Sequence, residues 1–151
     1  MSAFFAFLHH VSAFVLFAAL VVEFVLIRSA LTVESARKLQ RADMIFGISA
    51  GVLLLVGLAR VFHPFEKGAT YYFSTWAFIG KLALFVIIGL ISILPTIEFI
   101  RWGPALKAGQ VPTVSLEKLK RIRSIIHYEM VGVVLIILLA VLMARDIGPR
   151  L

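Results

Sequence analysis

The feature that most constrains the fold is an apolar stretch at residues 75–99 that carries a lysine, Lys81, well inside it. An α-helix rises about 1.5 Å per residue, so roughly twenty residues cross the hydrocarbon core of a bilayer. A lysine ammonium in that region costs at least about 2.5 kcal/mol. We therefore expect Lys81 to face protein, water or a bound ligand rather than lipid.

The composition favours an integral membrane protein. Hydrophobic residues make up 62% of the chain, whereas soluble domains are about 45–50% apolar. The chain has no cysteine, which excludes a disulfide, a thiolate metal site and a covalently attached c-type haem. Its formal net charge is +7, but the basic residues flank the apolar runs and are not interleaved with stacking aromatics. We therefore expect the basic residues to face the membrane surface, and we expect no nucleic-acid partner.

Three further apolar segments are close to the length of a membrane span. The four expected spans are residues 3–27, 42–62, 75–99 and 124–143, joined by connectors at 28–41, 63–74 and 101–123. Ser115 and the two residues after it have the pattern of a short interfacial helix that leads into the fourth span. The sequence thus predicts an all-α integral membrane four-helix bundle, with residues 1–151 as a single transmembrane domain.

The distribution of lysine and arginine predicts the orientation. Ten of these residues lie at the first and third connectors: Arg28, Arg37, Lys38, Arg41, Arg101, Lys107, Lys118, Lys120, Arg121 and Arg123. Four lie on the other side, namely Arg60, Lys67, Arg145 and Arg150. Because positive residues favour the cytoplasm, we expect both termini on the non-cytoplasmic side of a bacterial inner (cytoplasmic) membrane.

Polar residues inside the spans form two layers. The outer layer holds His9, His10, Arg60, His63 and Lys81, and the inner layer holds Glu23, Asp43, Glu98, His127 and Glu129. Steps of three and four residues place His9 and Glu23 on one face of the first span, and Lys81, Phe85 and Ile88 on one face of the third.

Glycine and alanine form a small-residue face on the second span. Gly47, Ala50, Gly51 and Gly57 follow one another at helical spacing. Such a face allows close helix approach or room for a flat ligand.

Each polar layer has a structural and a functional interpretation. Carboxylates near span ends often pair with neighbouring arginines, and this is the leading interpretation of Glu23, Asp43 and Glu98. Glu129 is deeper, so a structural and a functional role are both open. His9 and Lys81 have no obvious acidic partner at their depth, and an anionic or metal-bearing ligand would satisfy both.

The polar pattern of the outer layer resembles a known family. The histidine of Leu8-His9-His10-Val11, with the lysine of Phe78-Ile79-Gly80-Lys81-Leu82, resembles the HemJ-type membrane protoporphyrinogen oxidases. More closely, the chain is similar to a related bacterial membrane family of unknown function. The stretches that carry this second resemblance are His9-His10, residues 57–62, residues 92–96 and residues 143–148.

The resemblance implies a haem b-binding, redox-active membrane protein that passes electrons from a tetrapyrrole to quinone. It makes His9 the candidate iron ligand and Lys81 the partner of a propionate or a quinone-like acceptor. His10, His63 and Met143 are candidate second ligands, and Lys81 and Glu129 are candidate catalytic residues. The expected partners are the lipid bilayer, a tetrapyrrole or a quinone, and a second copy of the chain in a homo-oligomer.

Two other classes of function stay open. The ionisable residues of both layers also suit a proton- or metal-ion-handling transporter. In the third class the protein is a structural accessory subunit, whose polar residues only hold helices together. The visible spectrum of the purified protein separates the haem class from the other two.

Overall fold

The computed structural model describes residues 2–62, 68–145 and 147–148, and within these residues the secondary structure is helical. The helices are α1 (Ser2–Leu26), α2 (Val33–Phe62), α3 (Ala69–Phe73), α4 (Trp76–Arg101), α5 (Gly103–Lys107) and α6 (Leu116–Ala144). Four of them, α1, α2, α4 and α6, are long and apolar enough to cross a membrane. This confirms the predicted all-α architecture with four spans.

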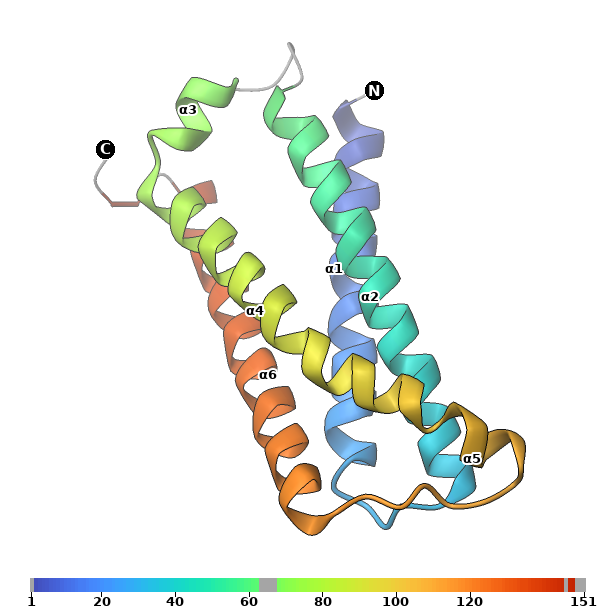
Figure 1. The fold of residues 1–151 in the computed structure, drawn as a ribbon. Helices are drawn as coiled ribbons and strands as arrows, with labels where there is room; N and C mark the ends of the chain where they lie inside the picture. Colours follow the sequence, from blue (N-terminus) through green and yellow to red (C-terminus); the bar gives the residue numbers. More distant parts are fainter. Residues whose placement is uncertain (1, 63–67, 146, 149–151) are drawn as a thin grey trace.

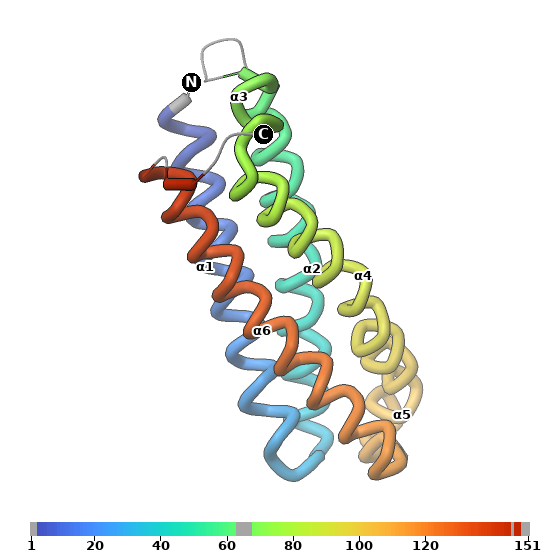
Figure 2. The backbone as a smooth tube through the Cα atoms, turned by 90° about the vertical axis from the view of Figure 1, so that its left-hand side faces the viewer, coloured from blue at the N-terminus to red at the C-terminus, as the bar shows by residue number. Residues whose placement is uncertain are grey.

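The four long helices form two packed pairs. Helix α1 packs along α2, and α4 packs along α6, while α2 and α4 have a smaller contact. Figure 1 shows that α1 begins and α6 ends at one end of the bundle, which we call the terminal end. Figure 2 shows α3 at the terminal end and α5 at the opposite end, which we call the connector end.

Helix α2 begins earlier than the predicted span because its first turn is capped. The backbone N–H of Ser35 donates to Thr32 Oγ1 at 3.1 Å, and the Thr32 N–H donates to Ser35 Oγ at 2.8 Å. This reciprocal pair satisfies N–H groups that have no partner within the helix. The expected connector at 28–41 is therefore too long, and its second half belongs to α2.

Helix α6 also begins before the predicted span. Ser115 is its N-cap, and its hydroxyl accepts a hydrogen bond from the Lys118 N–H at 3.3 Å. The residues expected to form a separate interfacial helix are the first turns of this one continuous helix. The apolar pattern missed them because charged residues at 117, 118, 120, 121 and 123 interrupt it, although Ile122 is buried.

The predicted inward faces of the first and third spans are correct. On α1, Ser12, Leu16, Leu20 and Glu23 are all buried. On α4, Ile88 is buried as predicted.

The small-residue face of α2 is not a site of close helix approach at Gly47 or Gly51. A Cβ built on either residue meets no atom within 4 Å in the described structure. Gly57 differs, because a Cβ there comes 3.5 Å from Cε1 of His9. Among the glycines of this face, the predicted close approach therefore occurs at Gly57.

Candidate functional site

A cavity opens between the two helix pairs toward the terminal end. Its unfilled space is about 750 Å³, with the open solvent at its mouth included. We call it the terminal cavity; the lining residues that matter here are His9, Arg60, Tyr72, Phe78, Lys81 and Met143. The remaining lining residues are all apolar, so the cavity combines an apolar surface with a few basic groups.

His9 enters the terminal cavity from α1, where the absence of a side chain on Gly57 leaves room for its ring. Its Nδ1 atom is buried, and no described residue forms a hydrogen bond with it. A buried polar atom without a partner is costly. The imidazole thus has an unsatisfied position beside an open cavity.

Lys81 lies on the opposite wall of the terminal cavity, on α4. Its Nζ is 5.5 Å from the centre of the Phe78 ring, close enough for a cation–π contact. Among the described residues, no carboxylate forms an ion pair with Lys81. Lys81 and Arg60 are within electrostatic range of each other and of His9, so two basic side chains reach this end of the cavity.

The structure separates the other candidate ligands of the sequence analysis. Met143 lines the terminal cavity with His9. His10 is exposed and does not line the cavity, and its Nδ1 lies 2.6 Å from the backbone oxygen of Ala6. His63 is outside the described residues.

Glu129 is not part of the terminal cavity. It is 1% exposed and lies two helical turns from Ile136, the nearest residue of α6 that lines the cavity. The sequence analysis grouped Glu129 with Lys81 as catalytic candidates, but the fold does not bring them to one site.

Three carboxyl groups meet instead in the interior of the connector half. Glu23 on α1, Asp43 on α2 and Glu129 on α6 are buried and interact electrostatically with one another. The Thr96 hydroxyl on α4 donates to Asp43 Oδ1 at 2.7 Å. We call Glu23, Asp43 and Glu129 the carboxyl cluster.

The expected pairing of these carboxylates with arginines is wrong. Arg123 Nε donates to the backbone oxygen of Ile27 at 2.8 Å, and Arg28 donates to the backbone oxygen of Phe24 at 3.0 Å and stacks over the Phe24 ring. Both arginines thus bind carbonyls at the C-terminal end of α1, where backbone oxygens lack partners within the helix.

Glu98 does form an ion pair, but with a lysine. Its Oε2 is 3.2 Å from Lys118 Nζ, and its Oε1 accepts a hydrogen bond from the Trp102 indole at 3.2 Å. This contact ties the connector ends of α4 and α6 together, so the structural interpretation of Glu98 fits its surroundings with a different partner.

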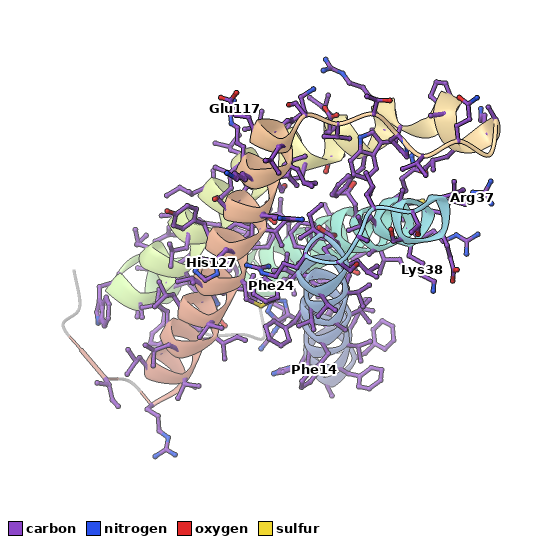
Figure 3. The ribbon with its side chains drawn as sticks, turned by 90° about the horizontal axis from the view of Figure 1, so that it is seen from below. Phe14, Phe24, Arg37, Lys38, Glu117 and His127 are labelled. Atoms are coloured by element: carbon purple, nitrogen blue, oxygen red, sulfur yellow. The ribbon has the colours of Figure 1, made fainter. Side chains whose placement is uncertain are left out.

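Figure 3 shows the molecule and its side chains from the connector end. Phe24 and His127 face each other from α1 and α6, with their ring centres 6.2 Å apart, whereas Phe14 and Lys38 project outward. His127 is exposed. The side chains that reach the interior at this level are therefore the carboxylates and not the histidine.

A family model described as a predicted membrane protein (DUF2214) matches residues 1–148. The chain belongs to this family. No curated protein and no solved structure matches the chain. Membership of a family of predicted membrane proteins agrees with the four apolar helices. The interior of the bundle has two notable features, the terminal cavity and the carboxyl cluster.

The carboxyl cluster is what sequence reasoning missed. Glu23 and Asp43 were interpreted through neighbouring arginines and Glu129 as a candidate catalytic residue, although the fold brings the three together from three helices. One signal was available: helical phase placed Glu23 on the buried face of α1, in line with His9. A carboxylate on a buried face, away from the flanking arginines, indicates an interior partner.

Proposed function

We propose that this protein binds haem b in the terminal cavity, with a ring nitrogen of His9 as iron ligand and Lys81 beside the propionate groups. The observation that carries the proposal is the buried Nδ1 of His9, which has no hydrogen-bond partner among the described residues and belongs to a ring on the cavity wall. An imidazole nitrogen is the usual protein ligand of b-type haem iron.

The other residues of the terminal cavity suit the same ligand. Leu53, Leu82 and Phe85 provide apolar wall for a macrocycle. Lys81 provides a positive charge that no described carboxylate neutralises, and an ammonium pairs with an anionic group as a point charge. Met143 is the candidate second ligand, because it shares the cavity with His9.

A redox role extends this proposal and rests on the resemblance to HemJ-type protoporphyrinogen oxidases. Bound haem supplies one-electron chemistry. The chain's own contribution is to hold the ligand in an apolar site and to place the Lys81 charge beside its anionic groups. In this extension a tetrapyrrole is the electron donor and a quinone of the bilayer is the acceptor.

The test is the visible spectrum and the haem content of protein purified from cells supplied with a haem precursor. Wild type is expected to show a Soret band and to contain haem. His9→Ala is expected to lose most of the haem or to change spin state. His10→Ala is the matched control, because His10 is the adjacent histidine and is exposed, and it should keep the wild-type spectrum.

Two results would overturn the proposal. One is wild-type protein that is folded but has no Soret band, even after titration with haemin. The other is equal haem content in His9→Ala and wild type. If His9→Ala and His10→Ala lost haem to the same extent, the loss would not be specific to His9, and the assignment of His9 as the iron ligand would be wrong.

A further inference from the structure

We propose that the carboxyl cluster is a proton-binding site, and that it exchanges protons with the terminal end through the interior of the bundle. This function is separate from haem binding and does not depend on it. The site uses Glu23, Asp43 and Glu129, with the Thr96 hydroxyl as a fourth polar group. Its ligand is the proton, held as a carboxylic acid O–H.

The burial of the cluster is the first argument. Glu23 and Glu129 are each 1% exposed, and Asp43 is 7% exposed. The Oε1 atoms of Glu23 and Glu129 are buried, and no described residue forms a hydrogen bond with either. Ionised carboxylates are taken out of water only when paired or coordinated, and otherwise become neutral. Carboxyl groups that share a site also cannot all carry charge.

Positive groups near the cluster do not neutralise it. The charged or titratable side chains around it are Arg28 just after α1, Arg37, Lys38 and Arg41 on α2, Glu98 and Arg101 on α4, and Lys118, Arg123 and His127 on α6. None of these forms an ion pair with the cluster in the described structure, and most have other partners or are exposed. A proton is the cation that can enter such a site without a coordination shell. Among the described residues, no group of histidine and carboxylate side chains is arranged to hold a metal ion.

The cluster is closed toward the connector end. One turn in that direction from each polar group lies an apolar side chain that is at most 2% exposed: Ile27 after Glu23, Leu39 before Asp43, Phe99 after Thr96 and Ile126 before Glu129. This layer is packed and apolar across all four long helices, so water has no direct route from the near end.

A cavity lies next to the cluster on the side toward the middle of the bundle. A second cavity of about 850 Å³, openings included, which we call the central cavity, is lined by Phe46, Ser92 and Val133. These residues lie one turn from Asp43, Thr96 and Glu129, respectively, on the side of the terminal end. The central cavity shares Leu53, Phe85 and Ile136 with the terminal cavity. The two cavities therefore adjoin at these three side chains, and the proposed route runs through both, to within one turn of the cluster.

Infrared spectroscopy of the full-length protein in detergent or lipid tests proton binding directly. A protonated carboxyl has a carbonyl stretch that a carboxylate lacks, and the band shifts in D₂O. Wild type at neutral pH is expected to show this band and to lose it at high pH. Glu23→Gln, Asp43→Asn and Glu129→Gln should each decrease it, because each removes one carboxyl while keeping nearly the same shape.

Glu117→Gln is the matched control, since Glu117 is an exposed carboxylate in the first turn of α6, and it should leave the band unchanged. The proposal is overturned if wild type has no carboxylic acid band at neutral pH. It is also overturned if the band is unaffected by all three cluster substitutions, or if adding sodium at constant pH abolishes it. The wild-type band and its D₂O shift are informative even if one variant does not fold.

A pair of glycine variants tests the route. Gly47 lines the central cavity and Gly51 lines neither cavity, and both have open space around a built Cβ. Gly47→Leu is expected to slow hydrogen–deuterium exchange of the carboxyl band, and Gly51→Leu is expected to leave the exchange rate unchanged. Equal rates in the two variants would overturn the proposed route.

Discussion

Replacing Lys81 with methionine should change stability and ligand binding in opposite directions. The substitution keeps the length and apolar bulk of the side chain and removes its charge. In the described structure Lys81 has the Phe78 ring as a neighbour but no acidic partner. If Lys81 served packing alone, its replacement would not change the binding of an anionic ligand.

The expected change in the free energy of unfolding follows from two opposing contributions. Lys81 is five residues in from Trp76, or about 7.5 Å along the helix. A charge at the bilayer centre costs about 2.5–3.5 kcal/mol, and less nearer the surface. The cation–π contact with Phe78 returns about 0.5–2 kcal/mol. We expect Lys81→Met to stabilise the ligand-free bundle by roughly 1 kcal/mol, with a lower haem content per protein.

The assay is unfolding in mixed detergent micelles, followed by tryptophan fluorescence, together with haem content and redox potential. Lys120→Met is the control, because Lys120 is an exposed lysine of α6, and it should change none of these quantities. A Lys81→Met protein that is less stable than wild type, with unchanged haem content and potential, would refute the reasoning. It would show that the ammonium has a structural partner and no role toward a ligand.

Three further predictions concern the membrane and the fold. A reporter active only in the cytoplasm should work when fused after Gln110 and not at the C-terminus, because positive residues concentrate at the connector end; the reverse pattern would overturn the expected orientation. Gly132→Leu should destabilise the bundle by about 1–3 kcal/mol, because a built Cβ there is 2.6 Å from Cδ1 of Ile88. Gly51→Leu should be tolerated, because a built Cβ there meets no atom within 4 Å. Equal unfolding midpoints for the two variants would contradict this contrast. Thr32→Ala should cost about 1 kcal/mol through loss of the α2 cap, and unchanged unfolding would mean that the capped turn contributes nothing to stability.

Much of the fold could be predicted because span length and helical phase are local properties of the sequence. Residues 75–99 differ from the observed α4 by only one or two residues at each end. The buried face of α1 followed from three- and four-residue steps alone. The start of α2 was placed too late, because the capping pair of Thr32 and Ser35 lies in a polar segment that hydropathy does not detect.

The candidate site was only partly predictable because it depends on which helices become neighbours. The depth of His9 and Lys81 along their spans was enough to place them at one level, and both line the terminal cavity. The carboxyl cluster required the relative rotation of α1, α2 and α6, which no single span encodes. For the same reason Gly51 was expected to pack against a neighbour and does not.

The division of the bundle into two helix pairs has a consequence for how the protein is assembled in the cell. Each pair is a hairpin that can enter the bilayer as a unit, and the α1–α2 and α4–α6 contacts can form as soon as each hairpin is inserted. The smaller contacts between the pairs, α2 with α4 and α1 with α6, can form only once both hairpins are in place. A ligand of the proposed kind, bound in the terminal cavity between the pairs, would add contacts to both pairs and would therefore favour the assembled bundle.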